Sequence, residues 1–139
     1  MKKMKPLVLA AAIHVFAGCS DQGGPVDPGN TNGNGNPAPA VSYREDVQPI
    51  WNANCAGCHG TSGGLTLVGG NSRSALVGVV SVGYAPEVRV VPGDPGRSVL
   101  YQKLLGNPDF GQRMPAGGAL GGEDLETIRA WIAEGAADN

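Results

Sequence analysis

The chain has 139 residues, enough for one domain, and a formal net charge of −2. It contains 23 glycines, whereas aromatic residues make up only 5% of it, so its apolar core has to be small. Three of its four lysines lie within the first five residues. From residue 19 onward there are seven cationic side chains and twelve carboxylates, a net charge of −5. Such an acidic chain lacks the basic surface of a nucleic-acid-binding protein, so we expect no nucleic-acid partner.

Residues 1–19 have the pattern of an export signal. Lysines at the start are followed by the apolar stretch 7–17, which only His14 interrupts. As a helix this stretch would be about 16 Å long, whereas the hydrocarbon core of a bilayer is roughly 30 Å thick. We therefore expect a signal peptide rather than a membrane-spanning helix, and a location in the periplasm or cell envelope.

The end of this segment, Phe16-Ala17-Gly18-Cys19, resembles the lipobox of bacterial lipoproteins, with Phe16 where that family usually has leucine. The resemblance implies that Cys19 is lipidated, becomes the first residue of the mature protein and anchors it to a membrane. Cleavage after Val15-Phe16-Ala17 by an ordinary signal peptidase is the alternative, and it would leave Cys19 as a free thiol. We prefer lipidation because this third cysteine has no other evident role.

The composition of residues 20–41 predicts a flexible linker. Glycine, proline and asparagine account for 13 of the 21 residues from 20 to 40, and such a segment cannot bury enough apolar surface to fold. A flexible chain of this length has a typical end-to-end distance of about 25 Å. We expect it to tether the folded domain, residues 42–139, and to let that domain reach partner proteins.

The domain begins with a helix that leads into a cysteine motif. Ser42 and Glu45 have the spacing of a capping box, and apolar residues follow at helical spacing. Pro49 removes an amide hydrogen and clashes with the preceding turn, so we expect a kink or a restart there. The last turns of this helix then lead directly into Cys55.

The motif Cys55-Ala56-Gly57-Cys58-His59 is the attachment signature of c-type haem. Residues i and i+3 lie on one face of a helical turn, so Cys55 and Cys58 can each form a thioether with one vinyl group of the haem. His59 is then placed to bind the iron as its proximal ligand. A large flat cofactor of this kind would also serve as the centre of a small apolar core.

Three other interpretations of this motif are weaker. A thioredoxin-like dithiol is expected within a βαβ pattern, and no strong strand pattern precedes Cys55. A zinc site needs four ligands, whereas Cys55, Cys58 and His59 are the only cysteine or histidine ligands beyond the signal segment. A plain disulfide between Cys55 and Cys58 would leave the histidine unexplained.

The segment 60–96 is punctuated by glycine, and we expect mainly loops that wrap the edge of the haem. Within it, residues 72–77 predict a short helix. Residues 87–91 alternate like a strand but end in Pro-Gly and have no obvious partner. Three arginines could bind the haem propionates, although solvated surface charge is the more ordinary role for each: Arg73, Arg89 and Arg97.

Two further helices are expected in the second half of the domain. Asp94-Pro95 has the residues of a helix cap and first turn, and this helix would end at Gly106. Residues 112–115 should be extended, since a residue before proline avoids helical geometry. The final helix spans about 123–134, with acidic residues in its first turn. Its apolar face, expected to pack on the first helix, comprises Leu125, Ile128, Trp131 and Ile132.

Elimination points to Met114 as the second axial ligand of the iron. Beyond the signal segment His59 is the only histidine and Met114 the only methionine, so two histidine ligands from one chain are impossible. A lone methionine is usually core filler, but this one adjoins Pro115 in a loop after the haem motif. Lys103 and an open site occupied by water are the alternatives. A thioether ligand raises the reduction potential, and a filled coordination sphere favours electron transfer over catalysis.

Residues 42–137 resemble class I cytochrome c and, more closely, bacterial cytochrome-c-like domains. The shared motifs occur in the same order, at 46–50, 55–60, 91–95, 98–104, 114–118 and 131–136. The resemblance implies an all-α fold of about four short helices and long loops around one covalently bound haem c, with His59 and Met114 as axial ligands. No proline closely follows His59 to indicate which carbonyl orients its other ring nitrogen.

The function that we expect is a monohaem electron carrier for redox protein partners in the cell envelope, not an enzyme. A haem-based sensor or a single-haem peroxidase-like enzyme with an open sixth site is the main alternative. A dihaem peroxidase is excluded because the chain has one attachment motif. A lipoprotein binding module without haem is the third possibility.

Overall fold

The computed structural model of the protein describes residues 41–60 and 62–139. These residues belong to the unit Ala38–Asn139. The expected signal peptide, Cys19 and linker residues 20–40 lie outside the described residues, so what the sequence predicts for them stays a prediction.

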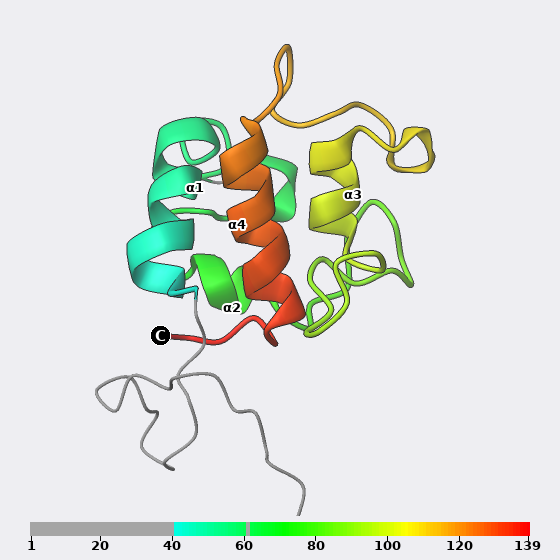
Figure 1. Cartoon of the computed structure of the whole chain (residues 1–139). Coiled ribbons are helices and arrows are strands. Elements are labelled where there is room, and N and C mark those ends of the chain that lie inside the picture. Colours follow the sequence, from blue (N-terminus) through cyan, green and yellow to red (C-terminus); the bar gives the residue numbers. More distant parts are fainter. Residues whose placement is uncertain (1–40, 61) are drawn as a thin grey trace, which may run out of the picture. The chain divides into compact units, whose positions relative to one another are not determined.

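The described part of the chain is helical, in agreement with the expected all-α class, and contains no β-strand. In chain order the elements are the π-helix η1 (Tyr43–Val47), α1 (Gln48–Asn54), the 3-10 turn η2 (Ser62–Gly64), α2 (Ser72–Leu76), α3 (Val99–Leu105), the 3-10 turn η3 (Pro108–Phe110) and α4 (Gly122–Ala133). Figure 1 shows α4 passing between α1 and α3 in this view. Long loops join them, above all between α2 and α3.

Residues 87–91, which alternate like a strand, lie in a loop, in line with the expectation of mainly loops over 60–96. Within this loop Val88 pairs with Val80 in an antiparallel bridge, and Val90 pairs with Val77 in a parallel bridge. The two bridges have opposite directions because the chain reverses between Val77 and Val80, where Gly78 has a φ of 72°. A ladder cannot continue across such a reversal, so the valines are held by single bridges in a loop.

The first helix begins as the sequence indicates and restarts at its proline. The Ser42 hydroxyl accepts a hydrogen bond from the Glu45 amide at 3.2 Å, as in a capping box. The returning bond differs from the expected one: the Asp46 carboxylate, rather than that of Glu45, accepts from the Ser42 amide at 2.8 Å. Pro49 lies in the first turn of α1, where its missing N–H costs no hydrogen bond.

The helix expected to begin at Asp94-Pro95 begins later, at Val99. The Asp94 carboxylate accepts from the Arg97 amide at 3.0 Å, and the Asp94 carbonyl accepts from the Ser98 hydroxyl at 2.8 Å. These bonds close a separate turn before the helix, because aspartate competes for backbone donors in a turn as readily as in a helix cap. The helix ends at Gly106, which has the expected left-handed conformation with a φ of 78°.

The core lies between the last helix and the first. Ile128, Trp131 and Ile132 of α4 are fully buried, and Leu125 packs against the same cluster. The Trp131 ring lies 5.0 Å from that of Tyr43 in η1, and α4 also contacts α3. The apolar face expected on the final helix therefore packs on the first helical segment as predicted.

The C-terminal residue closes the domain by capping η1. The Arg44 amide donates to the Asn139 carbonyl at 3.0 Å, and the Tyr43 amide donates to the Asn139 side-chain oxygen at 2.8 Å. The first amides of a helix have no acceptor within it, so the two Asn139 oxygens supply acceptors for the Tyr43 and Arg44 amides of η1. The two ends of the domain are thereby held together.

Candidate functional site

An apolar cavity of about 240 Å³ brings three of the four predicted haem-binding residues together: Cys55, His59 and Met114. Its wall is mainly apolar. The lining residues are Trp51, Cys55, His59, Leu65, Leu67, Leu76, Ser81, Val82, Gly83, Tyr84, Arg89, Val99, Leu100, Lys103, Leu104 and Met114. Trp51 lies in α1, the cysteine motif directly follows α1, and Met114 comes from the loop after α3. The cavity reaches the surface, because Val82 on its wall is 78% exposed.

Cys58 is exposed and does not line the cavity. It nevertheless belongs to the same turn as Cys55, because the Cys58 and His59 amides both donate to the Cys55 carbonyl, at 3.1 and 2.8 Å. This is the single hydrogen-bonded turn that the motif requires, with residues i and i+3 close on one face.

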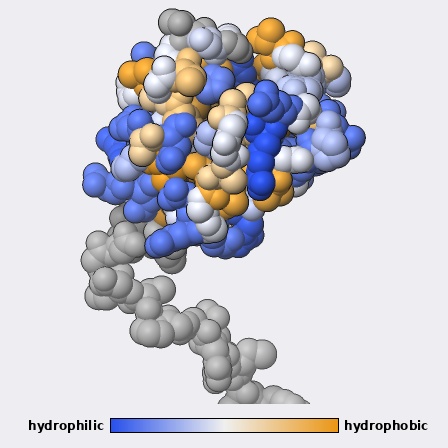
Figure 2. Space-filling view, turned by 90° about the horizontal axis from the view of Figure 1, so that it is seen from above, coloured by the Kyte–Doolittle hydropathy of each residue, from blue (hydrophilic) through white to orange (hydrophobic). Residues whose placement is uncertain are grey.

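Besides Val82, the exposed large apolar side chains of the described residues are Val68, Val80 and Leu105. Figure 2 shows apolar patches among hydrophilic side chains on one face of the domain.

His59 has one ring nitrogen held by the backbone and the other without an assigned role. Its Nδ1 lies 3.1 Å from the Ser62 carbonyl oxygen. A carbonyl can only accept, so Nδ1 donates here, and in the neutral imidazole Nε2 then keeps its lone pair. Metal-bound histidines are commonly oriented in this way by a backbone carbonyl. The residue that orients His59, which no proline indicated in the sequence, is therefore Ser62.

The environment of Cys55 differs from that of a redox-active dithiol. Burial, and to a smaller extent the neighbouring Cys58, raise the pKa of the Cys55 thiol to about 11. Thioredoxin-like and metal-binding cysteines need the opposite shift, because the thiolate is their reactive form. In addition, residues 41–60 and 62–139 contain no cluster of three histidine, cysteine or acidic side chains able to hold a metal ion. The raised pKa of the Cys55 thiol weighs against the redox-active dithiol interpretation of the motif.

Met114 is partly buried against the core, and its amide donates to the Lys103 carbonyl at 3.0 Å. The segment 112–115, expected to be extended, is instead a loop with bends at Gln112, Met114 and Pro115. An imidazole, a thioether and a thiol thus line one apolar cavity. Soft and imidazole donors of this kind suit haem iron, and apolar walls suit a flat apolar macrocycle, so the residues fit a haem.

Of the three arginines considered for the haem propionates, only Arg89 lines the cavity. Its guanidinium donates to the Ala75 and Gly64 carbonyls, both at 2.7 Å, and so joins α2 to the turn that contains Ser62. Arg73 instead donates to the Ala136 carbonyl at 2.9 Å, and Arg97 is exposed. Arg89 therefore connects α2 to η2 beside the cavity, a role that the sequence did not indicate.

Lys103, the alternative ligand considered from the sequence, has its ammonium group engaged by oxygen atoms. It donates to the Phe110 carbonyl at 2.8 Å and to the Gln112 carbonyl and the Tyr84 hydroxyl at 3.2 Å. An ammonium that donates three hydrogen bonds has no lone pair for a metal. Tyr84, which the sequence did not single out, lines the same cavity.

A polar network lies behind the cavity wall. The Tyr43 hydroxyl donates to the Ser72 hydroxyl at 2.7 Å, and Ser72 donates to the Gln48 side-chain oxygen. Burial raises the pKa of Tyr43, although the Ser72 hydrogen bond acts in the opposite direction. The buried Trp51 N–H approaches the Tyr43 hydroxyl without reaching hydrogen-bond geometry. The hydrogen bonds among Tyr43, Ser72 and Gln48 join η1, α2 and α1.

In the part of the chain that the structure describes, no helix is both long and apolar enough to cross a membrane. Comparison of the chain with protein families, with curated proteins and with solved structures finds no match.

Proposed function

We propose that residues 42–139 form a monohaem c-type cytochrome domain that transfers single electrons between redox proteins of the cell envelope. The observation that supports this most directly is the apolar cavity shared by Cys55, His59 and Met114, with His59 oriented by the Ser62 carbonyl. The cytochrome c-like fold, with helices and loops packed around the cofactor, is part of the same proposal.

Each residue of the site has a definite role in this proposal. Cys55 and Cys58 would hold the haem covalently, each through its sulfur. His59 Nε2 and the Met114 thioether would hold the iron, while the Ser62 carbonyl orients His59 through Nδ1. When bound, the haem supplies a one-electron iron couple, and thioether ligation raises its reduction potential.

The apolar walls would exclude water from the cofactor and favour its less charged, reduced state. With His59 and Met114 both holding the iron, a small substrate would have no direct access to it. This combination suits an electron carrier better than the alternative of a sensor or peroxidase-like enzyme, which needs an open sixth position. We propose the cell envelope as the protein's location because haem attachment of this kind requires export. Residues 1–19 have the pattern of an export signal.

The test is an absorbance spectrum, oxidised and reduced, of the full chain expressed together with the periplasmic haem-attachment machinery. We expect a c-type reduced spectrum and, in the oxidised protein, the weak far-red band of sulfur bound to ferric iron. Cys55→Ser and Cys58→Ser should each lose one thioether, which the spectrum of the denatured haem in alkaline pyridine reports. Cys19→Ser is the matched control and should keep both thioethers.

The outcomes separate the competing functions. A high-spin spectrum with covalent haem would shift the function to sensing or catalysis at an open iron. Absence of covalent haem after correct maturation would refute the proposal and support a binding module without haem.

We further propose that Cys19 carries a lipid and tethers the domain to a membrane through residues 20–41. Growth with a radioactive fatty acid should label the wild-type protein but not Cys19→Ser. An unlabelled wild type would refute the lipid anchor without affecting the haem proposal.

A further inference from the structure

The ammonium group of Lys103 lies among oxygen atoms from two loops beside the cavity. It donates to the Phe110 and Gln112 carbonyls and to the Tyr84 hydroxyl, at 2.8, 3.2 and 3.2 Å. An ammonium has three N–H donors, so all of them are used. The Lys103 Nζ also lies 5.1 Å from the centre of the Tyr84 ring, within the range of a cation–π interaction. No carboxylate takes part in these contacts.

Two of the three acceptors of Lys103, the Phe110 and Gln112 carbonyls, belong to the loop 107–114, which ends at Met114. This loop is also bound by the last carbonyls of α3, which have no partner within the helix. The Met114 amide donates to the Lys103 carbonyl and the Arg113 side chain donates to the Leu104 carbonyl, both at 3.0 Å. The Lys103 side chain thus binds the loop at Phe110 and Gln112, and the Lys103 carbonyl binds it at Met114.

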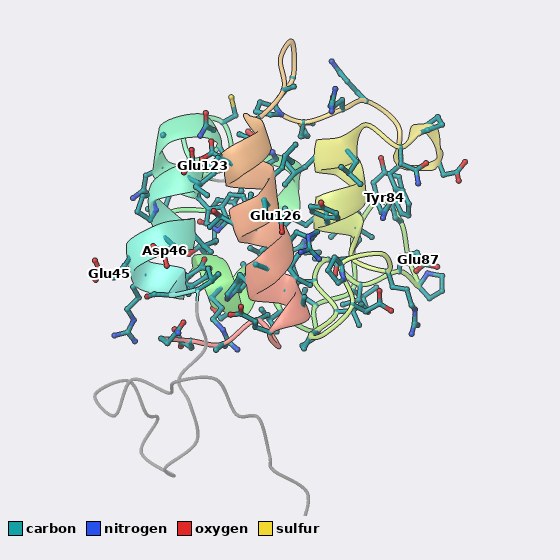
Figure 3. All side chains as sticks on the ribbon, in the orientation of Figure 1. Glu45, Asp46, Tyr84, Glu87, Glu123 and Glu126 are labelled. Carbon is teal, nitrogen blue, oxygen red and sulfur yellow. The ribbon has the colours of Figure 1, made fainter. Side chains whose placement is uncertain are left out.

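Tyr84 joins this arrangement from the preceding loop. Its hydroxyl donates to the Phe110 carbonyl and accepts from Lys103, and the Tyr84 and Phe110 rings are 5.4 Å apart. Figure 3 shows Tyr84 at the side of the domain where α3 and η3 lie. Gly111 has a φ of 70°, and a side-chain carbon there would lie 3.0 Å from the Tyr84 hydroxyl. The loop therefore packs directly on Tyr84, and Lys103 bridges the two.

We propose that Lys103 is a positioning residue for Met114: by hydrogen bonding to Phe110, Gln112 and Tyr84, its ammonium holds the loop 107–114 in the conformation that keeps the Met114 thioether at the cavity. This inference rests on the proposed function, in which Met114 is an axial ligand. A flexible loop would let the thioether leave the iron part of the time. Lys103 would thereby control how firmly the sixth position is closed, without touching the iron.

The experiment compares four full-length, haem-loaded proteins: wild type, Lys103→Leu, Lys103→Arg and Arg97→Leu. Leucine at position 103 keeps part of the apolar stem but can neither donate hydrogen bonds nor bind iron, whereas arginine keeps the charge and several donors. Arg97→Leu is the control for loss of one positive charge, because Arg97 is exposed and lies outside the cavity lining. Two quantities are measured: hydrogen–deuterium exchange of the loop 107–114, and the affinity of the ferric protein for cyanide.

For Lys103→Leu we expect loop exchange and cyanide affinity each to rise about tenfold, the effect of losing one well-placed charged hydrogen bond. Exchange in α4 should not change, which distinguishes a local effect from general destabilisation. Lys103→Arg should restore most of both values, and Arg97→Leu should match wild type.

Equal loop exchange in wild type and Lys103→Leu would overturn the proposal, and so would a cyanide affinity that Lys103→Leu and Arg97→Leu raise alike. A wild-type ferric spectrum without the far-red sulfur band would instead refute Met114 ligation, and with it the proposed function. In that case the exchange measurement still reports on the loop, and a tenfold rise confined to Lys103→Leu would support its fixation by Lys103.

Discussion

Replacement of Met114 by leucine is the most direct test of the distal ligand, because it removes the sulfur and keeps most of the packing. Met114 is partly buried against the core, and an exchange of methionine for leucine at such a site costs less than about 1.5 kcal/mol. For a domain of this size that corresponds to a fall in Tm of less than about 12 °C. The variant should therefore fold and retain its covalent haem.

The functional effects should be much larger than this change in stability. The far-red band of the ferric protein should disappear, and the ferrous protein should bind carbon monoxide, which the wild type should not do readily. Loss of the thioether removes a ligand that favours ferrous iron. A tenfold loss of that preference corresponds to about 59 mV for one electron, and we expect the reduction potential to fall by at least this amount.

The assay is a redox titration followed by absorbance, with carbon monoxide binding measured by flash photolysis. Leu100→Ala is the matched control, because Leu100 also lines the cavity and is partly buried, but it has no donor atom. That variant should lose stability and keep the far-red band. If Met114→Leu kept the band and excluded carbon monoxide as the wild type does, Met114 would not be the ligand.

Three further predictions concern the stability of the domain. Trp131→Ala should lower the free energy of unfolding by about 3–5 kcal/mol in urea titrations, because this indole is fully buried against Tyr43. Burial raises the pKa of Tyr43, so the folded state favours the neutral phenol; that contribution to stability is complete below pH 10 and is lost as the pH rises through the higher folded value. Tyr43→Phe should therefore flatten the alkaline loss of stability, and an unchanged pH profile would contradict this. Arg89→Leu should increase hydrogen exchange around Gly64 and Ala75, whose carbonyls it releases, whereas unaltered exchange there would show that this contact contributes little.

Local structure was predictable wherever a few neighbouring residues decide it. The Ser42 cap, the restart at Pro49 and the end of α3 at Gly106 each depend on one residue and the backbone beside it. The helix start expected at Asp94-Pro95 was wrong, because Asp94 closes a separate turn with Arg97 and Ser98 before the helix. A propensity alone could not decide this, since aspartate competes for backbone donors in turns and in helix caps alike.

The sequence by itself determined the chemistry of the candidate site: one Cys-x-x-Cys-His motif, a single remaining methionine and an acidic domain behind a signal-like segment. Only the tertiary structure brought Cys55, His59 and Met114 onto one apolar cavity. It alone supplied the Ser62 carbonyl for His59 and the Lys103 contacts for the Met114 loop. The physical reason is that donor type and short spacing are properties of the chain. A hydrogen bond to a backbone carbonyl carries no sequence signature, because every residue has one and packing selects which is used.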